Sequence, residues 1–127
     1  MQICQSLIGG KPMTSPLRAI DKIYPATGEI VAKIEPATQE MLDEAVAVAT
    51  FAQHSWAVYE PLARARILHR AASLMREANE ELAHLEVMDV GKLYTEAESA
   101  DVPSGTDAFD FFAAAITTQT GDFNKWD

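Results

Sequence analysis

Several features that define common classes of protein are scarce in this chain. Its 127 residues include one cysteine, Cys4, so no disulfide can form within the chain. Ten basic against 19 acidic residues give a net charge of -9, which repels nucleic-acid phosphates and anionic lipids. No apolar run approaches the roughly 18 residues of a membrane span, and the first residues lack a signal-peptide pattern. We therefore expect no nucleic-acid or membrane partner and a cytoplasmic location.

The first third of the chain is typical of strands and turns. A hydrophobic content of 48% over 127 residues is sufficient for one folded domain. Glycine and proline separate short apolar runs, which predict strands near 6–9, 19–24 and 29–35. Pro25-Ala26-Thr27-Gly28 combines a fixed φ with a residue that tolerates positive φ, as in a turn between antiparallel strands.

Beyond Thr38 the apolar residues recur at intervals of three and four, which indicates helices. Thr38 is a suitable N-cap for the first helix, and Gly91 suits the left-handed end of the third. Pro103 and Gly105 are expected to interrupt the chain before the last helix. The predicted helices cover 39–57, a segment that begins at Pro61, about 78–90, and about 103–117. The elements together predict an α+β fold.

Motifs for nucleotide binding are incomplete in this sequence. Gly91-Lys92 would belong to a phosphate-binding loop only with glycine at position 86 and Ser or Thr at position 93, but Glu86 and Leu93 occupy them. Gly9-Gly10 lacks both a third glycine and a following helix to hold a pyrophosphate. We therefore expect no nucleotide site within these residues.

The remaining candidate groups favour structural roles. His54, His69 and His84 fall on three predicted helices without a local pair, so we interpret them as surface residues rather than metal ligands. Cys4 has no neighbouring base in the sequence to form a thiolate, so we interpret it as an idle thiol. The many carboxylates fit the solvated faces of amphipathic helices better than an acid-base site.

Three segments together resemble a known family: Glu86-x-x-Asp89-x-Gly91-Lys92, Tyr24-Pro25-Ala26-Thr27-Gly28 and Arg64-Ala65-Arg66-Ile67-Leu68. They are similar to the amino-terminal part of the NAD(P)-dependent aldehyde dehydrogenases, most closely the betaine aldehyde dehydrogenases. The resemblance implies a small amino-terminal β-hairpin followed by about four amphipathic helices, without the Rossmann sheet of that fold. It predicts one amino-terminal fragment over 1–127, with strands within 6–35, helices within 38–117 and a divergent tail at 118–127.

The resemblance also carries an expectation about function. The intact family oxidises an aldehyde to a carboxylic acid through a cysteine nucleophile and NAD or NADP, and it carries those groups further along the chain than Asp127. The expected function is therefore that of a truncated dehydrogenase fragment that is non-catalytic alone and does not bind NAD or NADP by itself. Its partner would be the remainder of an aldehyde dehydrogenase. The alternative is an acidic helical interaction module that self-associates or docks on a full-length dehydrogenase.

One ion site is implied by the same resemblance. The family holds a potassium ion through main-chain oxygens and an aspartate, and the matching positions are Lys22, Ile23 and Asp89. Two alternatives stay open at this point. The Lys22 ammonium could take the place of the ion, or Asp89 could serve as a partner for Lys92 or for backbone amides.

Overall fold

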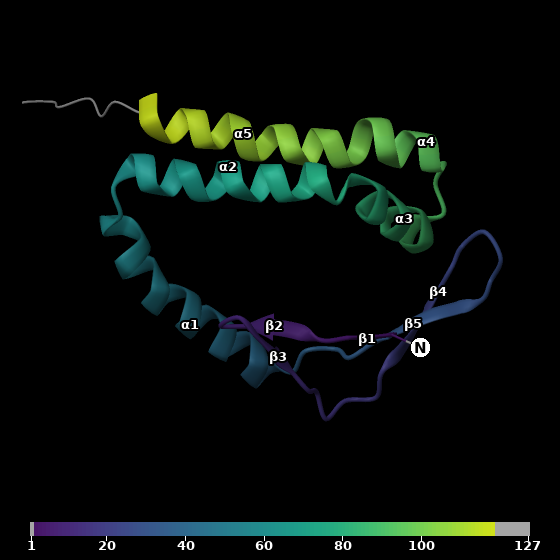
Figure 1. Cartoon of the computed structure of the whole chain (residues 1–127). Coiled ribbons are helices and arrows are strands. Elements are labelled where there is room, and N and C mark those ends of the chain that lie inside the picture. The colour runs from purple at the N-terminus through teal and green to yellow at the C-terminus, as the bar shows by residue number, and fades with distance from the viewer. Residues whose placement is uncertain (1, 119–127) are drawn as a thin grey trace, which may run out of the picture.

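The computed structural model describes residues 2–118 and arranges them as two short β-sheets and a set of helices (Figure 1). The strands are β1 (Gln2–Cys4), β2 (Ser6–Ile8), β3 (Lys11–Met13), β4 (Ile20–Ile23) and β5 (Ile30–Ile34). The helices are α1 (Gln39–Val58), α2 (Pro61–Glu77), α3 (Asn79–Val90), α4 (Tyr94–Glu96), the π-helical turn η1 (Ala97–Asp101) and α5 (Val102–Thr118). The α+β fold class is confirmed. Apart from Thr118, the expected divergent tail lies outside the described residues.

The sheets are built around the predicted hairpin. β4 and β5 pair antiparallel, with Lys22 opposite Ala32, and β1 joins the other edge of β5 in parallel. β2 and β3 form a separate antiparallel pair. The sequence did not predict β1 or β3, and β1 lies outside the expected strand range of 6–35. Each is only three residues long, too short to show an alternating pattern.

The turn between β4 and β5 has the predicted chemistry. Gly28 adopts a positive φ of 78°, and its amide donates to the Tyr24 carbonyl at 2.9 Å. The Tyr24 amide in turn donates to the Glu29 carbonyl at 2.8 Å, which closes the loop. The proline and glycine therefore act locally to reverse the chain.

Both predicted helix caps are present. Thr38 Oγ1 accepts a hydrogen bond from the Met41 amide at 3.2 Å at the start of α1. Hydrogen bonds from its own amide and from Thr38 hold the pKa of Glu40 below its usual range. Gly91 ends α3 in the left-handed conformation and donates to the Val87 carbonyl at 2.8 Å. Local capping chemistry thus fixes these ends.

The expected interruption at Pro103 and Gly105 is wrong. α5 begins at Val102 and continues directly from η1, so Pro103 lies in the first turn of α5. A proline is tolerated there because the chain before it forms a π-helical turn, in which the usual hydrogen-bond pattern is already shifted. Gly105 lies within α5, where an added Cβ would stand 3.4 Å from Met75 Cε of α2. The glycine thus lies at the contact between α5 and α2 rather than in a turn.

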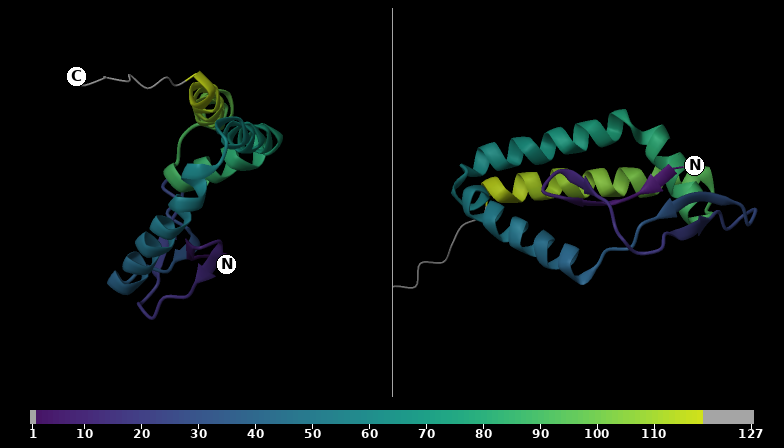
Figure 2. Two further views of the ribbon diagram at one scale, coloured as in Figure 1. Left: turned by 90° about the vertical axis from the view of Figure 1, so that its left-hand side faces the viewer. Right: turned by 90° about the horizontal axis from the view of Figure 1, so that it is seen from below.

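The core lies where α2 and α5 run antiparallel, side by side, in both views (Figures 1 and 2). The buried residues of this pair are mostly small, namely Ala65 and Ala72 on α2 and Val102, Thr106 and Ala113 on α5. A second cluster of Ala83, Ala97 and Val102 ties α3 to η1 and α5. Small side chains allow the helix backbones to approach closely.

α1 extends away from this pair toward the strands (Figure 1). Of its residues Met41 is buried, whereas the large apolar side chains Phe51 and Val58 are 84% and 83% exposed. Within residues 2–118, no helix combines the length and apolar character needed to cross a membrane. An amphipathic helix with so much exposed apolar surface is unusual for an isolated domain.

The contact between Gly91 and Pro25 gives a test of how the hairpin meets α3. An added Cβ on Gly91 would lie 3.0 Å from Pro25 Cβ, whereas one on Gly28 would meet no atom within 4 Å. Both glycines have a similar positive φ. We expect Gly91→Ala to lower the free energy of unfolding by about 2 kcal/mol and Gly28→Ala by about 1 kcal/mol, measured by urea denaturation. Equal losses would show that the Pro25 contact carries no cost.

Candidate functional site

The junction between the β4–β5 hairpin and the end of α3 brings together the residues that were predicted to hold an ion. Lys22 Nζ on β4 lies 2.6 Å from Asp89 Oδ1, in the last turn of α3. The side chains are 27% and 59% exposed, respectively. Ile23, the next residue of β4, is 51% exposed. Lys22 and Asp89 are therefore joined by an ion pair, and occupancy of this place by potassium stays a prediction.

The neighbouring lysine has a different partner. Lys92 Nζ forms an ion pair with Asp101 of η1. This hydrogen bond is the main reason that the pKa of Lys92 lies above its usual range, with smaller contributions from the charges of Asp101, Glu86 and Glu96 against a desolvation cost. The alternative in which Asp89 pairs with Lys92 is therefore wrong.

A cavity of about 460 Å³ lies beside the Lys22–Asp89 pair, between the strands and α3. Its walls come from β1, β4, β5 and α3, and they include Cys4, Lys22 and Asp89 among mainly apolar neighbours. No histidine lines this cavity, and Cys4 is exposed. The cavity therefore lacks the thiol-base pair that nucleophilic catalysis needs.

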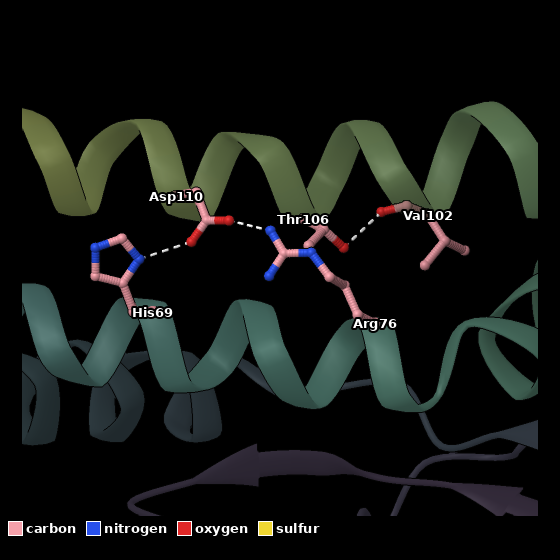
Figure 3. Close-up of polar contacts among 5 residues, drawn as sticks. All are labelled: His69, Arg76, Val102, Thr106 and Asp110. Atoms are coloured by element: carbon pink, nitrogen blue, oxygen red, sulfur yellow. Dashed lines mark hydrogen bonds and ion pairs between the residues drawn. The ribbon is translucent and has the colours of Figure 1, made fainter.

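A second polar cluster joins α2 to α5 (Figure 3). Asp110 of α5 accepts from His69 Nδ1 at 2.7 Å through one oxygen and from the Arg76 guanidinium through the other. The hydrogen bonds from His69 and then Arg76 hold the pKa of Asp110 below its usual range. Near these residues, the buried Thr106 hydroxyl donates to the Val102 carbonyl at 2.9 Å. The cluster links two helices and leaves no unpaired acid or base for chemistry.

The other histidines lie apart from this cluster. His54 on α1 is 3.0 Å from the Thr50 carbonyl through Nδ1, and the His84 ring on α3 lies 4.6 Å from that of Tyr94. Desolvation, followed by the hydrogen bond to Glu98, raises the pKa of Tyr94. The part of the chain that the structure describes contains no group of three or more His, Cys, Asp or Glu residues placed to hold a metal ion.

The glycine turns do not build a nucleotide site among residues 2–118. Gly9 and Gly10, with φ of 58° and 78°, connect β2 to its antiparallel partner β3 rather than to a helix. Gly91-Lys92 follows the carboxyl end of α3, whose partial charge is negative. A pyrophosphate needs amides at the opposite end of a helix. Neither glycine segment therefore places backbone amides of a helix start where a pyrophosphate would bind.

The Lys22–Asp89 pair corresponds to an alternative that the sequence left open, whereas the sequence alone missed three pairings: Lys92 with Asp101, and Asp110 with His69 and with Arg76. His69 and Asp110 are 41 positions apart, on different helices. Opposite charges on one helix face would have been visible through their spacing, but pairs across elements have no such periodic pattern.

Comparison with known proteins gives the chain clear relatives. The model of the aldehyde dehydrogenase family matches residues 13–126. A betaine aldehyde dehydrogenase of Rhizobium etli (strain CIAT 652) is 50% identical over 93 residues, which are 73% of this chain and 19% of that protein. Betaine aldehyde dehydrogenase 1 of Rhizobium meliloti (strain 1021) is 49% identical over 105 residues, 82% of this chain and 22% of that protein. The chain thus spans about a fifth of the length of these curated relatives.

A solved structure agrees with the sequence relatives. The crystal structure of PnpE in complex with nicotinamide adenine dinucleotide superposes with a TM-score of 0.93 and 29% identity. The superposition covers 100% of this chain and 26% of PnpE. The short strands and helices therefore have the arrangement of the amino-terminal portion of that fold.

The Asp110 cluster predicts a response to acid. Because its pKa is lowered in the folded state, Asp110 contributes stability that is present above its unfolded pKa of about 4 and is lost as pH falls through the folded value. We expect the melting temperature of Asp110→Asn to fall less between pH 6 and pH 3 than that of the unaltered chain, by about 2 °C.

Asp107→Asn is the matched control, because Asp107 lies on the same helix and forms no ion pair with any described residue. The two variants lose the same formal charge. If both flatten the acid response equally, the contacts from His69 and Arg76 do not cause it.

Proposed function

The chain belongs to the aldehyde dehydrogenase family, and on that premise we propose that it is the amino-terminal scaffold of an enzyme that oxidises betaine aldehyde to betaine. The observation that carries this proposal is the 50% identity to a betaine aldehyde dehydrogenase over 93 residues. In this proposal NAD or NADP accepts the hydride in the complete enzyme, and the protein acts in the cytoplasm. An exposed single thiol suits such a reducing compartment.

The described residues support a structural role within that enzyme. Their glycine turns do not fit a dinucleotide, and Cys4 lies in a cavity without a base. We therefore assign no catalytic step to them. Their contribution is the packed pair α2–α5 and the hairpin held at the end of α3. The potassium ion that the resemblance implies at Lys22, Ile23 and Asp89 is untested, and the scaffold proposal does not depend on it, because the Lys22 ammonium already pairs with Asp89.

A second candidate function rests on the exposed apolar side chains. Phe51 and Val58 on α1 and Phe111 on α5 are 84%, 83% and 67% exposed. Such surfaces favour association at about 25 cal/mol per Å² buried. The alternative proposal is therefore an interaction module that self-associates or docks on a full-length dehydrogenase.

The scaffold proposal predicts that the 127-residue chain alone does not turn over. Purified chain with betaine aldehyde and NAD or NADP should give no reduced cofactor above a buffer control, measured by absorbance at the nicotinamide band. Turnover that survives dialysis and disappears in Cys4→Ser would overturn the proposal.

A second experiment tests the scaffold proposal by a gain of function. In a chimera, this chain replaces the matching segment of the Rhizobium etli enzyme. If the segment is scaffold, the chimera should retain kcat/KM for betaine aldehyde within about tenfold of the parent enzyme, a loss below about 1.4 kcal/mol. A folded chimera with no activity would show that the segment carries a group needed for the reaction.

The interaction proposal predicts self-association that depends on salt. A net charge of -9 opposes association at low ionic strength, and added salt screens this repulsion. We expect light scattering to show a dimer or larger species whose fraction rises with salt.

Substituting Phe51 and Val58 with glutamine should shift the chain toward the monomer, because both side chains are apolar and exposed. Gln53→Ser on the same helix is the control and should change little. A monodisperse monomer at high salt that binds no hydrophobic dye would count against the interaction module.

A further inference from the structure

The carboxyl end of α3 carries more negative charge than its own residues can balance. Asp89 lies in the last turn of α3, and this turn contains no basic residue. A carboxylate here adds to the partial negative charge of the helix end, where the last carbonyls lack partners within the helix. Lys92, the lysine that follows the helix, pairs with Asp101 instead. A positive charge from another element would therefore stabilise the helix end.

β4 supplies that charge. Lys22 Nζ lies 2.6 Å from Asp89 Oδ1, and the lysine side chain is only 27% exposed. The strand that carries Lys22 is fixed by pairing with β5, where Lys22 is opposite Ala32. The turn that follows brings Pro25 against Gly91, directly after α3. The ammonium is thus placed by the fold at the helix end, rather than by a flexible surface contact.

A lysine ammonium carries the same charge as a monovalent metal ion and, like that ion, binds to carboxylate and carbonyl oxygens. A second monovalent cation bound to the same carboxylate oxygen would lie close to Nζ and be repelled by it. The structure therefore does not fit a potassium ion while Lys22 is charged and paired with Asp89.

We infer that the Lys22 ammonium is the built-in cation of the junction between the β4–β5 hairpin and α3. Without it, the Asp89 carboxylate and the carbonyl end of α3 form a binding site for an alkali-metal cation. The chemistry is that of a hard monovalent ion with oxygen ligands. This inference concerns the stability of the chain and is independent of any catalytic activity.

The test compares melting temperatures of the full chain in potassium chloride and in tetramethylammonium chloride at equal ionic strength. Equal ionic strength keeps general screening the same, and the four methyl groups of the organic ion keep its charge away from oxygen ligands. The unaltered chain should melt at the same temperature in both salts. Lys22→Met should melt about 2 °C higher in potassium chloride, because an ion that binds only the folded state stabilises it by mass action.

Two further variants isolate the cause of that shift. Lys22→Arg keeps a positive charge at the helix end and should be as insensitive to potassium as the unaltered chain. Lys22→Met combined with Asp89→Asn removes the carboxylate and should lose the potassium response.

The inference fails if Lys22→Met melts equally in both salts, or if the double variant keeps the potassium response. It also fails if Lys22→Met remains unfolded in both salts. On the unaltered chain, a titration with potassium chloride followed by amide NMR gives a separate check. Saturable amide chemical-shift changes at residues 87–92 with potassium, but not with tetramethylammonium, would show that the Lys22 ammonium does not exclude potassium.

Discussion

Close packing of α2 against α5 is the contact on which the rest of the described structure depends. The buried side chains of the pair are mostly small, and Gly105 of α5 lies against Met75 of α2, where an added Cβ would stand 3.4 Å from Met75 Cε. The segments α3, α4 and η1 connect the two helices, and the Ala83, Ala97 and Val102 cluster joins α3 and η1 to α5. Larger side chains at the buried positions would separate the helices and open this cluster.

The polar contacts between α2 and α5 fix how the two helices are aligned more than they stabilise the fold. Asp110 of α5 accepts hydrogen bonds from His69 and Arg76 of α2, and all three side chains are at least 32% exposed. Partly exposed ion pairs contribute little free energy of folding. The two partners of Asp110, His69 and Arg76, however, lie about two helical turns apart on α2. This arrangement therefore favours one sliding position of α5 along α2. The hydrogen bond from Thr106 to Val102 has a different role, because it satisfies a buried hydroxyl inside the interface.

The hairpin is attached to the helices by fewer contacts. The junction at the end of α3 combines the Lys22–Asp89 ion pair with the approach of Pro25 to Gly91. α1 then carries the chain from the strands to α2, with Phe51 and Val58 exposed along the way. The whole arrangement superposes on a quarter of PnpE with a TM-score of 0.93. Its shape is thus that of one part of a larger fold, which is why the proposed role is structural.

The sequence by itself determined the elements that local chemistry controls. Thr38 begins α1, Pro61 begins α2, Gly91 ends α3 and the Pro25–Gly28 turn joins β4 to β5, because caps and turns depend on residues a few positions apart. Helical periodicity likewise gave α1, α2, α3 and α5, whereas the short segments α4, η1, β1 and β3 offered too little pattern. Only the tertiary structure decided that Gly105 packs within a helix and that Asp89 meets Lys22 rather than Lys92. Those outcomes depend on which segments, distant in sequence, come together. The packing of the whole chain decides this, and the spacing of residues along the sequence does not.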